Sequence, residues 1–383
     1  MAARSVFAAL AGFLLVVVAP TAARAYPQWQ FSSGTTRCSQ CHFSPAGGGL
    51  ITGYGRDAVG DDLSTWQGNG DFAHGVSLPK WIALGADLRG AFLAQDAGNP
   101  EGRTTALFPM QADLQARTSF LDAFSIYATL GYRGQARTSD TPLGSNNFKA
   151  AATSRVVSRE HYVMWRPNAQ GAYVRAGRFF APYGLRLAEH TTYVRRDLGS
   201  NLLGETYGIS GGALADDWEL HVTAFVPDPM QTFGGREKGG AALYEHRWAS
   251  MMALGLSARA GMADDYKRYS AGGFGKIYVA PARILMMAEA DLVDWHPGPA
   301  ASVKQLVGYA GLTAFPVKGL WLGASAEISQ GDIAVKGTAT SALDGQINWF
   351  PYPHCEVVIL GRLQSPSGQT STKTLMAQLH YNL

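Results

Sequence analysis

Cys38, Cys41 and His42 are the residues of this sequence whose types and spacing point most directly to chemistry. They form the pattern C-x-x-C-H, in which two thiols bond the vinyl groups of one porphyrin and the next imidazole ligates its iron. Two intervening residues let both sulfurs reach neighbouring edges of the same macrocycle. The motif predicts one covalent haem c with His42 as the proximal ligand. One alternative is a disulfide; another is half of a zinc site, which would need two further ligands in a sequence without a second C-x-x-C.

The ligand on the other face of the iron is less clearly defined. No Met occurs between Tyr26 and Lys80, and His74 is the only other His there, so His74 is the first candidate for distal ligand. The alternative is a solvated surface histidine. Bis-His ligation predicts a low reduction potential, because it lacks the Met that raises the potential of many cytochromes; an open position would permit peroxide chemistry. Three histidines are reserve ligands or ordinary polar lining residues: His221, His354 and His380.

The first 25 residues have the features of a secretory signal. Arg4 gives a basic start, an apolar run extends from Phe7 to Val18, and small residues precede a cleavage point after Ala25. The run is shorter than the roughly 20 residues that a membrane anchor needs. We therefore expect an exported protein whose cysteines meet an oxidising compartment.

The composition disfavours an ordinary soluble enzyme and a nucleic-acid-binding protein. Charged residues make up 16% of the chain, and 45 of its 383 residues are Gly, whereas soluble domains carry about 25% charged residues and about 7% Gly. The net charge of +3 is too small to indicate nucleic acid as a partner. Beyond the signal, no apolar stretch reaches about 18 residues, so only a closed barrel of strands could span a membrane.

The sequence after residue 79 alternates apolar and polar residues in segments about ten residues long, the length of a tilted membrane strand. In the segment 218–226, for example, Leu220 and Val222 alternate with His221. Because successive side chains of a strand point to opposite faces, we expect lipid on the apolar side and water on the other. About sixteen segments are present, joined alternately by long outward loops and short periplasmic turns. A soluble β-sandwich is the alternative.

The predicted fold class is all-β, a transmembrane antiparallel barrel of about 16 strands with a short N-terminal haem-binding segment. The expected organisation is a signal peptide at 1–25, the haem-binding segment at 26–79 and the outer-membrane barrel at 80–383. The segment has 54 residues, few for an independent core, so we expect haem and barrel to complete its packing at the periplasmic mouth or inside the lumen. Aromatic residues near segment ends predict interfacial girdles: Trp165, Trp218, Trp248, Trp321, Trp349 and Tyr381.

The residues that follow the motif strengthen the haem prediction. A glycine triplet at 47–49 and the run Tyr54, Gly55, Arg56 come after C-x-x-C-H, and glycine permits close approach to a flat ligand and positive φ. This stretch, 38–56, resembles the haem-binding stretch of bacterial c-type cytochromes fused to outer-membrane barrels. The alternative for the glycines alone is a flexible linker.

A second stretch, Ala176 to Arg186, resembles the strand-to-loop passage of porins in the phosphate-selective group, with G-R-F followed by P-Y-G. With Arg175, Arg195 and Arg196 nearby, it predicts a basic constriction that favours anions. The alternative is that the loop arginines pair with Glu189 and Asp197. The candidate pore-lining residues are Arg178, Arg186, Arg195 and Arg196.

These features predict an outer-membrane porin and c-type cytochrome in one chain, taking part in electron transfer at or across the outer membrane. Because one haem cannot relay electrons alone over an apolar band about 25 Å tall, we expect periplasmic or extracellular redox proteins as partners, besides outer-membrane lipid and a homotrimer of the porin kind. The rival function is a passive porin with the haem segment as plug or redox gate. A third hypothesis is a haem enzyme acting on peroxide or nitrogen oxides. No residue group in the sequence is an evident acid or base for such a reaction, so we expect an electron carrier or a channel.

Overall fold

The computed structural model describes residues 27–32, 34–98, 102–132, 156–198, 204–228, 237–298 and 301–383. The predicted signal peptide lies outside the described residues. The strands are β1 (Ile82–Asp96), β2 (Arg103–Phe120), β3 (Phe124–Tyr132), β4 (Val156–Trp165), β5 (Gly171–Phe179), β6 (Thr206–Leu214), β7 (Trp218–Val226), β8 (Lys238–Trp248), β9 (Met252–Met262), β10 (Tyr266–Val279), β11 (Ile284–Pro297), β12 (Val303–Val317), β13 (Leu320–Gln330), β14 (Ala339–Trp349), β15 (Cys355–Pro366) and β16 (Thr372–Asn382).

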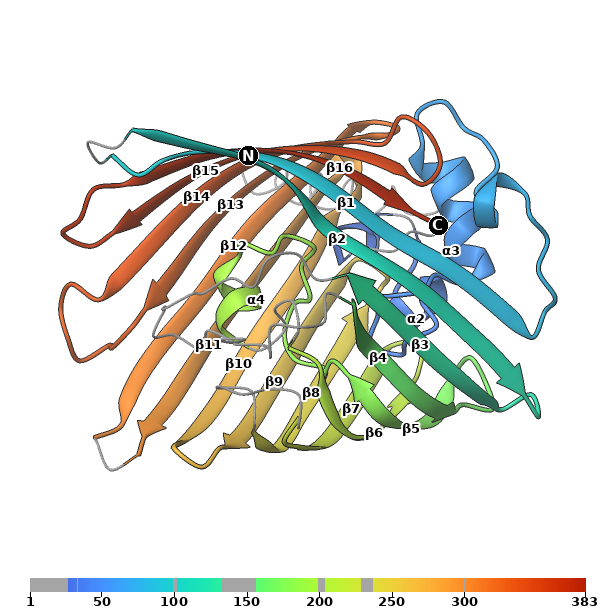
Figure 1. The fold of residues 1–383 in the computed structure, drawn as a ribbon, viewed down its shortest axis with the longest axis horizontal. Coiled ribbons are helices and arrows are strands. Elements are labelled where there is room, and N and C mark those ends of the chain that lie inside the picture. The colour runs from blue at the N-terminus through green and yellow to red at the C-terminus, as the bar shows by residue number, and fades with distance from the viewer. Residues whose placement is uncertain are drawn as a thin grey trace, which may run out of the picture.

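These strands form one closed barrel (Figure 1). Each strand pairs antiparallel with the next, and β1 pairs with β16, where Leu88 lies opposite Tyr381. Closure satisfies the backbone N–H and C=O groups of every strand, which an open sheet edge in lipid could not do. The predicted antiparallel barrel of 16 strands is confirmed.

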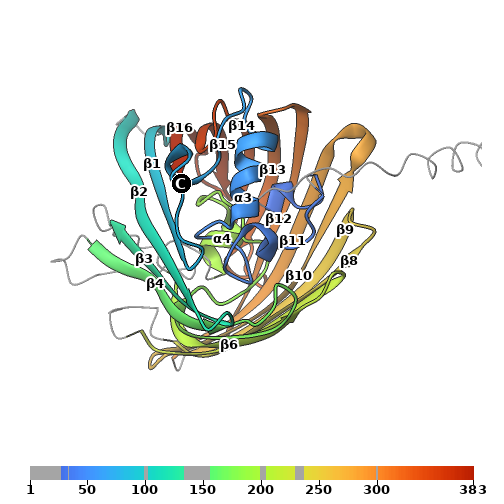
Figure 2. The same cartoon turned by 90° about the vertical axis from the view of Figure 1, so that its right-hand side faces the viewer.

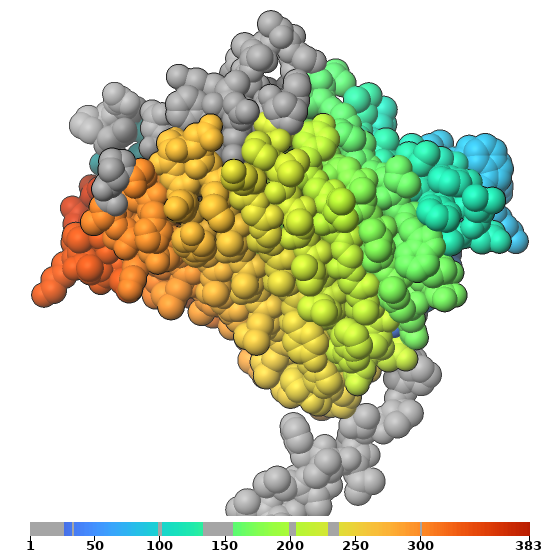
Figure 3. Space-filling model, turned by 90° about the horizontal axis from the view of Figure 1, so that it is seen from below, coloured from blue at the N-terminus to red at the C-terminus, as the bar shows by residue number. Residues whose placement is uncertain are grey.

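The alternation seen in the sequence decides which side chains face outward. On β7, Val222 is 53% exposed on the outer wall, whereas His221 is 1% exposed and faces the lumen. On β16, Leu379 faces outward in the same way and His380 inward. Figure 3 shows the outer wall over the green, yellow and orange strands from β5 to β12. Apolar side chains on this wall suit contact with lipid.

The connections differ between the two ends of the barrel. Turns of two or three residues at 121–123, 215–217, 249–251 and 318–319 lie at one end, called the short-turn end below. The same end carries connections of four or five residues at 166–170, 280–283 and 350–354. At the other end every connection has five residues or more, with the exception of 263–265 between β9 and β10. β1 begins and β16 ends at the short-turn end (Figure 1). The chain before β1 therefore reaches the barrel from that end.

Residues 27–79, called the N-terminal segment below, form short helical turns: η1 (Pro27–Trp29), α2 (Cys38–Cys41), α3 (Gly53–Asp57), η2 (Ala58–Leu63) and η3 (Phe72–His74). Figure 2 looks along the barrel and shows the blue turns of this segment within the outline of the ring of strands. Gln30 donates Nε2 to the carboxylate of Glu245 on β8 at 3.0 Å. In the described part of the chain, none of the helices has the length and apolar character needed to cross a bilayer.

Trp29 fixes the start of the N-terminal segment against the wall. It is 1% exposed, and its ring centroid lies 4.5 Å from that of Trp321 on β13 and 5.2 Å from that of Phe350. The prediction that Trp321 belongs to an interfacial girdle is wrong. Its side chain points into the lumen, where contact with Trp29 buries it.

The connection between β5 and β6 also enters the lumen, and its residues 180–198 are called the inward loop below. It contains the helix α4 (Tyr193–Asp197), which Figure 2 shows inside the ring. The Leu185 N–H donates to Glu289 on β11 at 2.8 Å, and the Tyr183 hydroxyl donates to Asp291 at 2.8 Å. These bonds tie the loop to the far wall of the barrel.

The lumen holds an apolar core between the N-terminal segment, the inward loop and the wall. Leu285 and Met287 of β11 point inward and belong to the same buried cluster as Trp29, Leu63 and Leu187. The prediction that the lumen face meets water is wrong for this part of the wall. Those strands carry apolar residues on both faces because protein, and not solvent, lies against their inner side.

Candidate functional site

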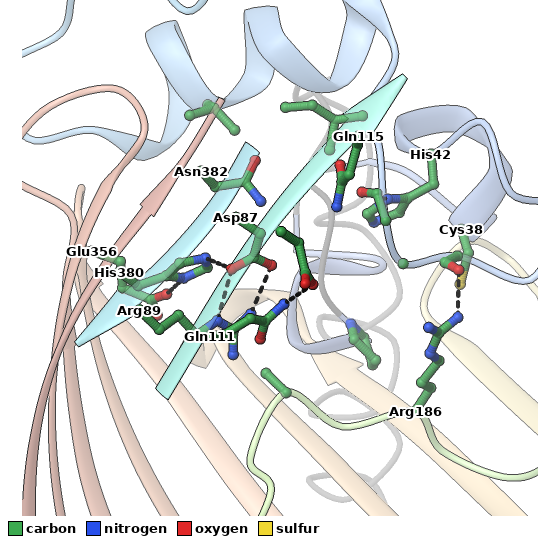
Figure 4. Close-up of a pocket in the computed structure, with 18 of the residues that line it drawn as sticks. Cys38, His42, Asp87, Arg89, Gln111, Gln115, Arg186, Glu356, His380 and Asn382 are labelled. Carbon is green, nitrogen blue, oxygen red and sulfur yellow. Dashed lines mark hydrogen bonds and ion pairs between the residues drawn. The ribbon is translucent and has the colours of Figure 1, made fainter. Parts of the chain in front are cut away.

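One cavity in the lumen lies between the N-terminal segment, the inward loop and the wall near the short-turn end (Figure 4). It contains about 1320 Å³ of empty space, part of which is open to solvent. Its wall includes Cys38, His42, Gly47, Asp87, Arg89, Asp113, Arg159, Arg186, Arg195, His354, Glu356 and His380.

The C-x-x-C-H motif forms the single helical turn α2 and the residue after it. Gln40 Oε1 accepts from the backbone N–H groups of Thr36 and Arg37 at 3.0 Å each, which caps the start of this turn. The His42 N–H donates to the Cys38 carbonyl at 3.0 Å. Because residues four apart on a helical turn share a face, Cys38 and His42 both line the cavity. Cys41, one residue before His42, is 1% exposed and does not line it.

The His42 ring is oriented by the backbone that follows it. Its Nδ1 lies 3.3 Å from the carbonyl oxygen of Gly49. With the proton on Nδ1, the ring donates this hydrogen bond and Nε2 becomes the atom able to bind a metal. A backbone carbonyl on the other ring nitrogen is one of the ways in which proteins fix a metal-binding histidine. The ring is largely buried, with 8% of the residue exposed.

The glycine triplet makes a tight turn against the motif and the wall, not a loose linker. Gly47 has φ +79°, and a Cβ there would lie 2.9 Å from Cβ of Cys38 and 3.8 Å from Cδ2 of His42. Gly49 has φ +65°, and a Cβ there would lie 2.4 Å from the Tyr127 hydroxyl oxygen. Only glycine fits both the backbone conformation and the space. The same Tyr127 hydroxyl accepts from the Leu50 N–H at 3.1 Å, which attaches the turn to β3.

The two thiols are separate in this structure. Cys38 and Cys41 form no disulfide. Burial raises the pKa of Cys38 to about 11 and that of Cys41 to about 12, so both are protonated at neutral pH. Within the described ranges, no three His, Cys, Asp or Glu residues are grouped so that they could hold a metal ion.

Charged side chains from β1, β15 and β16 form the opposite wall of the cavity (Figure 4). Asp87 pairs with Arg89 at 3.0 Å and with His380 at 3.0 Å. His380 Nδ1 lies 2.8 Å from Glu356. Sequence reasoning placed His380 on the lumen face but missed Asp87 and Arg89 as site residues. Their inward position in the strand alternation was the signal that could have found them.

Of the four histidines considered as distal ligands, two line the cavity and two do not. His74 is exposed at the rim, where its Nε2 lies 2.7 Å from the Tyr381 hydroxyl, and it does not line the cavity. His221 lies elsewhere, 2.7 Å from the Tyr173 hydroxyl. His354 and His380 line the cavity; the ring nitrogens of His354 meet the carbonyls of Asn382 and Asp71.

Of the four predicted pore-lining arginines, two line the cavity and two do not. Arg186 and Arg195 line the cavity. Arg178 pairs with Asp228 at 3.2 Å and lies outside the lining, and Arg196 pairs with Asp197 at 2.6 Å. The alternative of ion pairing therefore holds for Arg196 and Asp197.

Comparisons with known proteins agree with this architecture. The sequence matches no protein-family model and no curated protein. OmpF of Salmonella typhi, solved in complex with daunomycin, is similar in structure with a TM-score of 0.62 at 9% identity, over 79% of this chain and 97% of the other. OmpT of Vibrio cholerae gives 0.60 at 8% identity, over 81% and 100%. An anion-selective porin from Comamonas acidovorans gives 0.55 at 11% identity, over 79% and 99%. The chain has the fold of an outer-membrane porin.

Proposed function

We propose that this chain is an outer-membrane barrel whose lumen carries one covalent haem c, and that it takes part in electron transfer at or across the outer membrane. The observation that carries the proposal is the shared cavity of Cys38 and His42, with the His42 ring held by the Gly49 carbonyl. The porin fold supports the location in the outer membrane. The comparisons themselves support a channel and do not bear on redox chemistry.

Cys38 and His42 line one cavity, which supports a haem there, whereas Cys41 lies outside the lining and would have to turn toward it. Cys38 and Cys41 would form the two thioethers and His42 would be the proximal ligand, as the motif implies. The bound haem would supply an iron that alternates between two oxidation states. The chain itself holds the imidazole through Gly49 and shields the site with the apolar core around Trp29. An apolar, buried environment of this kind is one of the means by which proteins set a reduction potential.

The distal ligand stays a prediction. For His74 to reach an iron near His42, η3 would have to move inward, away from the contact between His74 and Tyr381. His354 and His380 already line the cavity, so they are the alternative candidates for the distal ligand. Ligation by any of the three gives bis-His coordination, for which we expect a low potential.

The thickness of the membrane's apolar band is the reason to expect redox partners. One haem cannot relay electrons alone over an apolar band about 25 Å tall. Periplasmic turns are the short ones in such barrels, so the cavity would lie toward the periplasm. We propose a small periplasmic redox protein as one partner and a second redox partner outside.

Covalent attachment of haem is the first test. Protein purified in detergent from cells that make c-type cytochromes is heated in SDS, and porphyrin absorbance on the polypeptide is measured. We expect absorbance in the wild type and in Cys355→Ala, the matched control on β15, and none in the double variant Cys38→Ala, Cys41→Ala. A wild type without bound porphyrin would overturn the proposal. Electron transfer is then tested by mixing the haem-loaded protein with a reduced small cytochrome and following oxidation of the donor.

A second candidate function is a diffusion channel closed by the N-terminal segment. The porin fold and the charged cavity wall favour it. Single-channel conductance in planar bilayers distinguishes a channel closed by the N-terminal segment from an open pore. We expect a low conductance for the full chain and a severalfold increase when residues 27–79 are deleted; deletion of the outer loop 332–337 is the control. Equal conductance with and without the segment would exclude a plug, and a change on reduction would indicate a redox gate.

Assembly is a separate matter. The homotrimer expected from the sequence stays a proposal, supported by a solved trimer form of OmpT of Vibrio cholerae with the same fold.

A further inference from the structure

Three strands finish at the short-turn end on a tryptophan that faces outward. Trp165, Trp248 and Trp349 are the last residues of β4, β8 and β14, and all three are exposed. On β14, Ile347 is exposed in the same way, whereas Asn348 between them is buried. Tryptophan rings concentrate where the hydrocarbon of a bilayer meets its headgroups. These residues therefore mark the level of the membrane interface at this end of the barrel.

The N-terminal segment crosses the rim of the barrel next to β14. Leu63 belongs to the buried cluster of the lumen, but Trp66, a short distance further along the chain, is 54% exposed. The N–H groups of Thr65 and Trp66 donate to the carbonyls of Phe350 and Pro351 at 2.8 and 3.1 Å. Consecutive backbone hydrogen bonds thus fasten the crossing point to the turn that joins β14 to β15.

Trp66 packs against the outward tryptophan of β14. Its ring centroid lies 5.4 Å from that of Trp349, at an interplanar angle of 78°. It also lies 4.8 Å from the ring centroid of Tyr352, which is 56% exposed. The indole Nε1 of Trp349 donates to Thr65 Oγ1 at 3.2 Å. Trp66 therefore joins the aromatic residues at the level of the interface, although it comes from a part of the chain outside the strands.

The local backbone holds Trp66 in this exposed position. The Gln67 N–H donates to the Ser64 carbonyl at 3.5 Å, which closes a turn with Trp66 at its tip. Ser64, at the base of the turn, is fully buried. Thr65 passes close to Gly319 of the turn between β12 and β13, where an added Cβ would lie 2.9 Å from the Thr65 nitrogen. Because the base of the turn is fixed on both sides, the exposed ring is a defined feature of the fold.

We propose that Trp66, together with Trp349 and Tyr352, forms a lipid-binding patch that anchors the N-terminal segment in the headgroup region of the bilayer leaflet at the short-turn end. The segment is then held in two places. Trp29 packs the part that carries the motif into the lumen, and Trp66 attaches the part that crosses the rim to the membrane. The inference does not depend on a haem, so it stands or fails separately from the proposed function.

Continuity with the outer wall favours lipid over a protein as the ligand of this patch. Trp349 shares the outer wall with Leu343 and Ile347, whose exposed apolar side chains suit contact with the hydrocarbon of the bilayer. An indole ring has an apolar body and one polar N–H, which suits a position between hydrocarbon and water. A water-soluble protein that covered the patch would have to displace the lipid next to Trp349.

Photo-cross-linking at single positions tests the contact. The photoreactive residue p-benzoylphenylalanine replaces Trp66, Trp349 or Trp321 in the full chain, one position at a time, and intact cells are irradiated. Migration as a folded barrel on gels confirms that each variant is assembled, and mass spectrometry of the purified protein identifies what is attached at the position. Trp349 is the positive control. Trp321 is the matched negative control, because it lies at the same end of the neighbouring strand β13 but is buried in the lumen.

We expect phospholipid adducts at positions 66 and 349 and only cross-links within the chain at position 321. Position 66 should give an adduct yield comparable to that of position 349, because the two rings are in contact. A cross-link from position 66 to another protein, without a lipid adduct, would overturn the lipid assignment and show that the patch is a protein-docking surface. The absence of any phospholipid adduct at position 66 in a folded barrel would equally overturn the proposal.

Discussion

The burial of Trp29 predicts how firmly the N-terminal segment is held in the lumen. Trp29 is 1% exposed and makes edge-on contacts with Trp321 and Phe350. Replacing a buried Trp by Ala costs about 3–5 kcal/mol, and each 1.4 kcal/mol is about tenfold in an equilibrium constant. Trp29→Ala should therefore raise the equilibrium constant for local opening of the segment by about 10² to 4 × 10³. The matched control is Trp66→Ala, because Trp66 is 54% exposed.

Hydrogen exchange measured by mass spectrometry is the assay. The protected amides of the segment include those of His42, Phe43 and Thr52, which donate to Cys38, Leu50 and Cys41. We expect them to exchange faster in Trp29→Ala and at the wild-type rate in Trp66→Ala, while amides of the barrel ladder stay protected in both. If the segment exchanges equally fast in all three proteins, the reasoning that the barrel wall holds it through Trp29 is refuted.

Two further predictions concern the turn after the motif and the charges of the lumen. Gly49→Ala should reduce both haem content and thermal stability, because the left-handed backbone alone costs about 1–2 kcal/mol and the new Cβ meets a hydroxyl at 2.4 Å; Gly53→Ala, with open space around it, is the control for the haem-to-protein ratio. Arg159→Met should destabilise the barrel by about 3–5 kcal/mol, since it removes the ion-pair partner of buried Asp113 and leaves buried Glu205 with Arg178 at 3.8 Å. The control is Asp216→Asn, which breaks an ion pair whose carboxylate is 81% exposed and should cost less than about 1 kcal/mol of stability. The measurement is the fraction of each variant that still migrates as a folded barrel on gels after heating. An equal decrease of this fraction in both variants would contradict the ranking.

Much of the fold could be predicted because its signals are local. A strand presents alternate residues to opposite faces, so the pattern around Val222 and His221 marks its own inner and outer sides. The count of strands and the ends at which turns lie follow from the same period and from the lengths of the connections. The spacing of Cys38, Cys41 and His42 likewise carries its chemistry in five consecutive residues.

The candidate site could be predicted only in part, because its members come from distant elements. The motif and the glycines were identifiable, but the meeting of Asp87 with His380 depends on the closing pair of β1 and β16. The sequence offered four arginines of equal standing; the path of the inward loop decided that Arg186 and Arg195 line the cavity.

The amino-acid sequence by itself determined the barrel and the C-x-x-C-H motif, since alternation, turn length and motif spacing are properties of neighbouring residues. Only the tertiary structure decided what fills the lumen. Trp321, which resembles an interfacial aromatic in the sequence, is instead buried under Trp29. Such packing joins residues nearly three hundred positions apart, and the free energy of burying their apolar surfaces depends on the whole closed wall and not on any local pattern.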